Sequence, residues 1–370
     1  MRQASARAAS SLFDPERLKL ARQMAGFQKK DLAKALNLTP AAITQYEQGQ
    51  TRPRPAVMAS LALVLGCPVE YFVQDGRPRQ NADPSAAFFR SLRSTRQYER
   101  EQATAKAELV WEVCHAIEQE VDLPLVDLPD LSLPEDAGVD AIEEAALDLR
   151  AAFGLGDGPV PHVIRVLESR GVIVARLRAT NDRIDAFSQW FADRPVVVLW
   201  DAKDDAARSR SDAMHELAHL VLHHDPEPGN KILEDQAQTF TGAVFMPAHV
   251  VSDYLPRRAP RAGDWADLFE LKRTLGVSVS NLLYRAKTLR LLSPQAHRRA
   301  MIAMSERGWR ADEPGDIGPP EQPSLLHSAV ELLAADRGFG PGELATALSV
   351  HPERVEEVLG PVHERLAFTA

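Results

Sequence analysis

The feature that constrains this chain most is a His-Glu-x-x-His pattern, His215-Glu216-x-x-His219, inside an apolar helical run at residues 211–222. On a helix, residues four apart lie on the same face, so both imidazoles can direct a nitrogen at one point. Glu216 lies beside that point and can take a proton from a metal-bound water. Two histidines that hold a tetrahedral zinc, next to a carboxylate base, are the parts of a metallopeptidase.

A third metal ligand is expected from the next helix. Apolar residues recur at helical spacing over residues 232–247, and the pattern ends at Pro247, which predicts a second buried helix. Glu234 lies one turn before the buried Ala237 on the same face, so its carboxylate can reach a metal held by the first helix. We therefore predict Glu234 as the third protein ligand of a Zn²⁺ ion.

Other side chains are alternatives to Glu234. Asp225 falls ten residues after the first histidine, where some zinc peptidases place a ligand, but Leu222 stands where those chains usually have a glycine. Asp235 is the second alternative. His223 lies one turn beyond the second histidine and could in principle join it. Together with His224, it is better interpreted as the end of the helix, where donor side chains complement exposed carbonyls.

Composition limits the class of protein and its compartment. A chain of 370 residues with 45% apolar residues is expected to form two or three domains. Two distant cysteines, Cys67 and Cys114, are too few for a disulfide scaffold or a cysteine metal site, which suits a reducing compartment. The N-terminus lacks a secretory apolar segment, and no apolar run approaches the ~20 residues that span a bilayer. We therefore predict a soluble, cytoplasmic protein without a membrane partner.

Charge is distributed unevenly along the chain. Residues 1–80 contain 12 Lys and Arg against 6 Asp and Glu, a balance of +6, whereas the whole chain carries −9. The remainder therefore carries −15. A basic head on an acidic body indicates that only the head contacts nucleic acid.

The basic head is predicted to contain four short helices. Asp14 is a candidate cap for the first, Thr39-Pro40 supplies a cap and a first-turn proline for the third, and Gly66 ends the fourth. Two short helices joined by a few residues, the second with small and polar outward groups, are typical of a helix-turn-helix. The four helices are expected at residues 15–25, 28–36, 41–47 and 55–65.

The third helix of the head is the one expected to enter the major groove of DNA. Small outward residues such as Ala41 let the helix approach the bases, and Thr44 and Gln45 can then bond base edges. A second set of residues stands where phosphate contacts would position the module: Gln28, Lys29, Lys30 and Arg52.

The head also contains two spaced motifs, Gln28-x-x-x-Leu32-Ala33 and Ile43-x-x-Tyr46-Glu47-x-Gly49-x-x-x-Pro53. Together they resemble the Cro/CI-like, Xre-type helix-turn-helix family. The resemblance implies base contacts at Gln28, Thr39, Pro40 and Thr44, although Pro40 has no backbone N–H to donate. It implies a double-stranded DNA operator as partner. Since such modules read half-sites about one helical turn apart, a homodimer is expected as well.

A small sheet is expected before the histidine-bearing helix. Three runs rich in β-branched and aromatic residues predict strands at 172–177, 186–191 and 195–200. Helical stretches are expected at 85–120, 139–153 and 161–170, and the prolines of residues 122–136 predict an extended crossing. A sheet packed over the helix that carries the two histidines is the arrangement expected of a zincin.

Four segments of this region form a combined pattern: Ile184-Asp-Ala-Phe-Ser188, the Arg-Pro-Val-Val-Val strand, the histidine motif, and Glu234-x-x-Ala-x-x-Phe with the later Met246-Pro247. They resemble the ImmA/IrrE family of metallo-endopeptidases, which is known for fusions with Xre-type modules and for cleaving repressors. The resemblance implies zinc ligands His215, His219 and Glu234, with Glu216 as general base. Ala218 stands where a glycine is common and Gln236 where a glutamate is frequent, and neither departure removes a ligand.

The expected fold class is α+β and mostly α. It combines an all-α helix-turn-helix domain, a zincin-like domain with a small sheet on the zinc helix, and a helical C-terminal region. The tail after residue 324 is acidic, which favours protein packing or dimer contact over DNA. The predicted parts are a DNA-binding domain at 13–75, a helical connector at 76–160, a zincin-like domain at 161–262 and a helical extension at 263–370.

Two functions follow from joining these motifs in one chain. The first is a DNA-binding transcriptional regulator whose zinc-dependent endopeptidase cleaves a repressor or another regulatory protein. The alternative is a transcription factor, or an antitoxin or prophage-type autoregulator, whose zincin-like domain senses a ligand or partner without proteolysis.

Overall fold

The N-terminal module is a cluster of short helices with caps where the sequence predicts them. The computed structural model describes residues 12–73, 88–89, 96–179, 186–201, 205–223 and 230–361, and the module occupies the first of these ranges. The side chain of Asp14 accepts a hydrogen bond from the backbone N of Glu16, and that of Thr39 accepts one from Ala42. The elements are α2 (Pro15–Met24), α3 (Lys29–Ala35), α4 (Pro40–Glu47), α5 (Pro55–Leu65) and the 3-10 turn η1 (Val69–Phe72).

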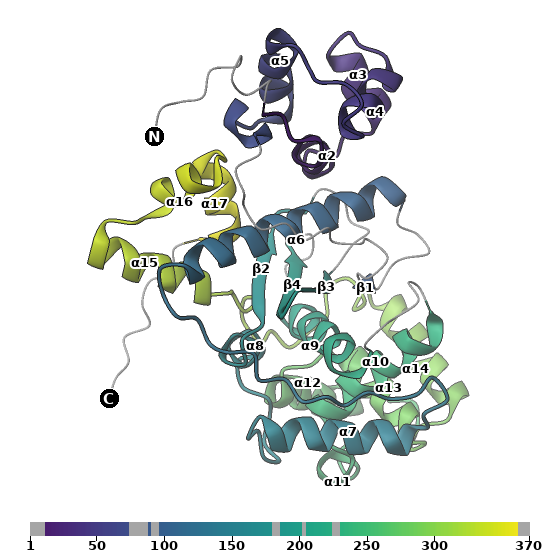
Figure 1. Cartoon of the computed structure of the whole chain (residues 1–370). Coiled ribbons are helices and arrows are strands. Elements are labelled where there is room, and N and C mark those ends of the chain that lie inside the picture. Colours follow the sequence, from purple (N-terminus) through teal and green to yellow (C-terminus); the bar gives the residue numbers. More distant parts are fainter. Residues whose placement is uncertain are drawn as a thin grey trace.

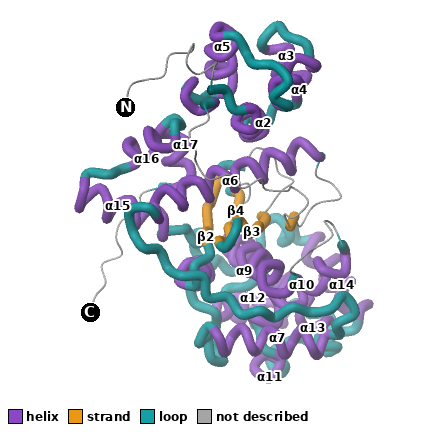
Figure 2. The backbone as a smooth tube through the Cα atoms, in the orientation of Figure 1, coloured by secondary structure: helices purple, strands orange, loops and turns teal. Residues whose placement is uncertain are grey.

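A small mixed sheet forms the centre of the rest of the molecule (Figure 2). Its strand order is β1-β3-β4-β2, in which β2 and β4 are parallel and the other two pairs are antiparallel. The strands are β1 (Phe88–Phe89), β2 (Ile173–Leu177), β3 (Ala186–Phe191) and β4 (Arg194–Trp200). The predicted α+β, mostly α, fold class is confirmed.

Strand β1 is an element that the sequence analysis missed. We predicted helix throughout residues 85–120, but the helix there, α6 (Gln97–Glu118), begins later, and Phe88 instead pairs with Ser188 of β3. Without this partner, β3 would present a row of unpaired backbone groups at the edge of the sheet. The need to pair that edge, together with the strand preference of phenylalanine, outweighs the helical spacing of the surrounding apolar residues.

Alternate residues of the sheet face two separate cores. In β2, Ile173, Ala175 and Leu177 belong to the core shared with α6, whereas Val174 faces the core around α9 (Ala206–Leu222). Strand β4 alternates in the same way, as the two-residue period of a strand requires. Figure 1 shows α6 along one side of the strands and α9 on the other. The sheet therefore separates the predicted metal-binding helix from α6.

The core around α9 is built mostly from helices. An extended segment, residues 122–136, crosses the end of α9, and the backbone N atoms of Leu131 and Leu133 donate to the carbonyls of Val221 and Leu222. These bonds satisfy carbonyls that the end of a helix leaves open. The surrounding helices are α7 (Val139–Ala152), α8 (Val163–Ser169), α10 (Lys231–Phe245), α11 (Ala248–Val251), α12 (Asp264–Leu275), α13 (Val279–Thr288) and α14 (Pro294–Glu306).

Helix α6 joins the N-terminal module to the sheet. On one side it packs on α2, where Arg17 and Glu112 form a buried ion pair and the side-chain amide of Gln102 donates to the carbonyl of Met24 at 3.1 Å. On the other it contacts β4, and the C-terminal helices pack against it, so the tail serves protein packing within the chain. Those helices are α15 (Leu325–Arg337), α16 (Pro341–Leu348) and α17 (Pro352–Leu359).

Candidate metal centre and DNA-contacting surface

Helix α9 carries the two histidines of the central motif. It starts after Asp205, whose side chain accepts a hydrogen bond from the backbone N of Arg208 at 2.6 Å, and runs for 17 residues without a proline or glycine. His215 and His219 are both buried one turn apart, with ring centroids 4.7 Å from each other. The four-residue spacing therefore brings two imidazoles to the same face of the helix.

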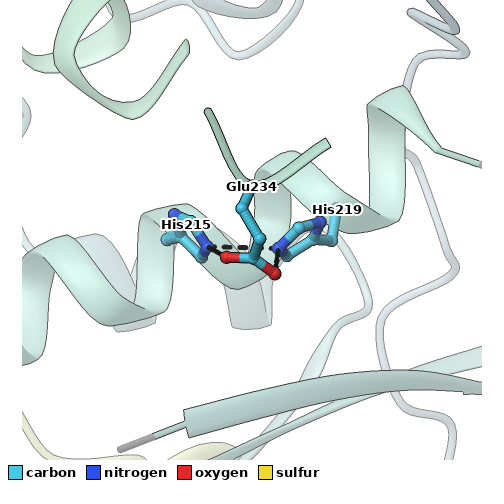
Figure 3. A group of neighbouring side chains, drawn as sticks. All are labelled: His215, His219 and Glu234. Carbon is cyan, nitrogen blue, oxygen red and sulfur yellow. Dashed lines mark hydrogen bonds and ion pairs between the residues drawn. The ribbon is translucent and has the colours of Figure 1, made fainter. Parts of the chain in front are cut away.

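Helix α10 adds a carboxylate between the two rings. Glu234 is in the first turn of α10, and its Oε2 lies 3.2 Å from Nε2 of His215 while its Oε1 lies 3.5 Å from Nε2 of His219. The two Nε2 atoms are 3.1 Å apart. Figure 3 shows both rings pointing at the Glu234 carboxylate, which comes from the neighbouring helix. Of the alternative ligands, Asp235 is exposed, and Asp225 lies outside the described residues.

The donor set fits a divalent metal such as zinc. Ligands held in a tetrahedron at about 2.0–2.2 Å from one ion lie roughly 3.3–3.6 Å from each other, close to the separations of these three donor atoms. Burial acts to raise the pKa of the Glu234 carboxyl, but the hydrogen bonds with His215 and His219 outweigh it and hold that pKa well below its usual range. The carboxylate is therefore ionised, as a ligand must be. Three protein ligands leave one tetrahedral position for water or substrate.

Glu216 follows His215 directly on α9, and its side chain is held by the sheet. Its side chain is completely buried, and its Oε2 accepts a hydrogen bond from the Ser188 hydroxyl at 2.8 Å. Ser188 is in β3, which packs directly on α9. Ser188 belongs to the sequence pattern that resembles the ImmA/IrrE family, but the pattern alone predicted no role for it. Only the packing of β3 on α9 places its hydroxyl on the carboxylate.

His223 and Gln236 form a second layer behind His219. Nδ1 of His223 lies 3.1 Å from Nδ1 of His219, and its Nε2 lies 3.1 Å from Oε1 of Gln236. Burial and the neighbouring His219 lower the pKa of His223 to about 4, so the ring is neutral near pH 7. We predicted that His223 ends the helix, and α9 does end at Leu222 with His223 as its C-cap. The His223 side chain, however, contacts His219 and Gln236, while backbone N–H groups of residues 122–136 donate to the last carbonyls. His224 lies outside the described residues.

The residues predicted to contact DNA gather around the outer face of α4. Thr39, Pro40, Ala41 and Gln45 are exposed at its start and along it, and Thr44 is half-buried, with its hydroxyl bonded to the carbonyl of Pro40 at 3.1 Å. The candidate phosphate contacts surround this helix. Arg52 is exposed after α4, and Gln28 and Lys29 are half-buried at the start of α3. Both base-contacting and phosphate-contacting candidates are thus on one module.

A buried ion pair holds α4 against the rest of the module. The guanidinium of Arg22 bonds Glu47, the last residue of α4, and donates to the carbonyl of Phe27 at 2.8 Å. Lys29 reaches the same carboxylate at 3.3 Å. Because Glu47 neutralises part of the charge of Lys29, that lysine both positions α4 and lines the surface predicted to contact DNA.

Comparison with protein families agrees with both parts of this description. Residues 18–72 match a helix-turn-helix family model, and residues 167–287 match a peptidase family model described as an IrrE N-terminal-like domain. No curated protein matches the chain. None of the helices within the described ranges has both the length and the apolar character needed to cross a membrane.

The two matches confirm the predicted combination of a helix-turn-helix with an ImmA/IrrE-like domain. The first match supports a DNA-binding role in transcription regulation, and the second supports a metallopeptidase-like domain. The three converging side chains lie inside the second match, on α9 and α10. The chain therefore joins a DNA-binding module to a metallopeptidase-like domain with a candidate metal centre.

Proposed function

We propose that the chain is a DNA-binding transcriptional regulator whose second domain is a zinc-dependent endopeptidase that cleaves a repressor or another regulatory protein. The observation that carries this proposal is the convergence of His215, His219 and Glu234 beside the buried Glu216. A sensor domain needs ligands for a metal, but it has no need of an additional carboxylate held next to them. That carboxylate is what hydrolysis requires.

Five residues of this chain would take part in the hydrolysis. Zn²⁺, when bound by His215, His219 and Glu234, supplies a Lewis acid and lowers the pKa of a coordinated water toward ~7. Glu216 takes the proton of the attacking water and passes it to the leaving nitrogen of the peptide. The Ser188 hydroxyl donates a hydrogen bond to Oε2 of Glu216 and so orients the carboxylate.

The helix-turn-helix would bring this activity to an operator. Ala41 and Gln45 on α4 are exposed for base contacts, and Arg52 for contacts with phosphate. We propose that two copies bind neighbouring half-sites as a homodimer, since modules of this class read half-sites about one helical turn apart. A repressor bound at the same operator would then be within reach of the peptidase.

The substitution Glu216→Gln tests the proposal. It keeps the zinc ligands and removes the base, so the variant should bind zinc, retain its captured protein partner and cleave it at least about 100-fold more slowly than the wild type. Partners captured by the variant would be identified by mass spectrometry and offered to zinc-loaded wild-type protein. Glu168→Gln is the matched control, because Glu168 is also buried but caps the segment at Ser324, and it should cleave normally.

Two outcomes would contradict the proposal. Undiminished cleavage by Glu216→Gln would remove the assigned mechanism. Zinc-loaded wild-type protein that cleaves none of its captured partners, while a ligand changes its operator affinity, would support the sensing alternative.

A further inference from the structure

A continuous series of polar contacts connects one metal-ligand candidate to the extended segment that crosses the end of α9. It runs from Nδ1 of His219 to Nδ1 of His223 at 3.1 Å, and from Nε2 of His223 to Oε1 of Gln236 at 3.1 Å. From there the amide nitrogen of Gln236 reaches the carbonyls of Pro134 at 2.8 Å and Glu135 at 3.2 Å. All three side chains are buried.

The two backbone carbonyls at the end of this series determine which atom of each side chain carries the proton. The carbonyls of Pro134 and Glu135 can only accept hydrogen bonds, so the atom of Gln236 that faces them must be its NH₂ group. The amide oxygen of Gln236 must then face His223. An amide oxygen can only accept, and Nε2 of His223 must therefore carry the proton of that ring.

The same reasoning extends to the metal-ligand candidate. A neutral imidazole carries one proton, so Nδ1 of His223 has a lone pair and accepts. The contact of 3.1 Å with His219 then requires a proton on Nδ1 of His219. Its Nε2, the atom directed at Glu234 and at Nε2 of His215, is left with the lone pair that a metal ligand needs.

We propose that His223 and Gln236 are positioning residues that hold His219 in the tautomer able to bind the metal through Nε2. This inference rests on the proposed metal centre but does not depend on proteolysis. Metal-ligating histidines usually donate their second N–H to a carboxylate, a carbonyl or water. Here the acceptor is a neutral imidazole that is itself oriented by a buried amide, so the orientation of the ligand derives from the backbone of residues 134–135.

The proposal is tested by two substitutions at His223. Leucine is of similar size but removes the acceptor for Nδ1 of His219, and zinc affinity should fall about 10- to 100-fold, the usual cost of losing such a partner. Asparagine is smaller but can place its side-chain oxygen near the former Nδ1 as an acceptor, and His223→Asn should stay within about threefold of the wild type. Gln236→Leu should also weaken zinc binding, by a smaller factor than His223→Leu because it acts through His223.

A buried glutamine far from the centre controls for loss of packing. Gln102→Leu removes a hydrogen bond to the Met24 carbonyl at the contact between α6 and α2, so it should leave zinc affinity unchanged. Zinc affinity would be measured by competition with a chelator, using full-length protein and thermal unfolding to verify that each variant is folded. Equal loss of affinity in His223→Leu, His223→Asn and Gln102→Leu would show a general packing effect and overturn the proposal.

Nuclear magnetic resonance of the zinc-loaded protein gives a readout that packing alone would not change. Long-range ¹H–¹⁵N spectra should show His223 with its proton on Nε2, and a scalar coupling across the hydrogen bond between the two Nδ1 atoms. In Gln236→Leu the tautomers of His223 should become mixed. A proton on Nδ1 of His223 in the wild type would overturn the inference and leave the proposed peptidase intact. Wild-type protein that binds no zinc would overturn both.

Discussion

The surface proposed to contact DNA and the candidate metal centre are built in opposite ways. The surface uses exposed side chains of one eight-residue helix, α4, with support from residues on either side of it in the sequence. The candidate metal centre uses two buried histidines of α9 and the half-buried Glu234 of α10, with the carboxylate of Glu216 held by β3. Substitutions on the surface should therefore change binding with little effect on stability, whereas substitutions at the centre change several contacts together.

The two regions are also physically connected, which limits how far they act separately. Helix α6 carries Glu112 and Gln102, which contact α2 of the module, and its other side packs on β4. The sheet in turn packs on α9. Within the described residues, α6 and the sheet thus connect α2 to the metal centre. The following predictions test how far the two regions act separately.

The largest effect is expected where the two regions meet. Arg17→Met would leave Glu112 buried without its ion-pair partner, and the free energy of unfolding should fall by about 3–5 kcal/mol. Denaturant unfolding of the full chain measures it. Lys19→Met is the control, because Lys19 forms an exposed pair with Glu16 at 3.4 Å that is worth at most about 1 kcal/mol. Equal losses in the two variants would contradict the importance of the α2–α6 contact.

The next effect concerns the metal centre alone. Zinc sites with four ligands are worth about 10–16 kcal/mol, so His215→Ala, which removes one ligand, should cost roughly 3 kcal/mol, or about 100-fold in zinc affinity. Operator affinity should stay within about twofold, because the buried apolar residues described for α4 and for α9 belong to separate hydrophobic cores. Chelator competition and a DNA-binding titration measure the two values. His249→Ala, at an exposed histidine paired with Asp157, should change neither. A parallel loss of operator binding in His215→Ala would show that the metal controls the module.

On the DNA-contacting surface, two substitutions should separate sequence reading from electrostatic attachment. Gln45→Ala should lower the preference for the operator over unrelated DNA by about 1–3 kcal/mol, because it removes a contact with a base edge. Arg52→Ala should weaken binding to all sequences and reduce the slope of log affinity against log salt by about 1. Titrations at several salt concentrations distinguish them. Zinc affinity should be unchanged in both, and if Gln45→Ala weakens all DNA equally, Gln45 does not contact a base.

The last prediction is a pH dependence at the α2–α6 contact, in which the change within any one pH unit is small. Burial, and then the charge of Glu112, raises the pKa of Glu108 from 4.5 to about 8. A carboxyl whose pKa is raised by folding favours the folded state while it is protonated. Its contribution is therefore full below pH 4.5 and is lost as the pH rises toward 8, by at most about 1.4 kcal/mol per unit. Unfolding from pH 5 to 9 should be flatter in Glu108→Gln, and an unchanged profile would exclude Glu108 as the cause.

Much of the fold could be predicted because its signals are local. The caps at Asp14 and Thr39 determine where α2 and α4 begin, and consecutive β-branched residues indicate β2 and β4. The exception, β1, depends on a long-range pairing with β3 that its own residues do not indicate. The four-part domain division stays a prediction.

Of the candidate site, only the three residues that would bind the metal directly and the adjacent Glu216 were predictable. A spacing of four residues on a helix brings His215 and His219 together in any fold, and Glu234 follows from the phase of the next helix. The roles inferred for Ser188 and Gln236 depend on which elements pack against α9. The helix end at His223 was predictable, but the contacts of its side chain with His219 and Gln236 were not, because they depend on the same packing.

The sequence by itself determined the chemistry that this protein carries: two imidazoles and an acid at helical spacing, and a small helix with polar outward residues. These features involve residues a few positions apart, so the geometry of a single helix is enough to relate them. Only the tertiary structure decided which groups form hydrogen bonds around the two imidazoles and the acid. Those partners come from segments up to about a hundred residues away in the chain, such as Pro134 against Gln236, and only the burial of a shared core brings them into contact.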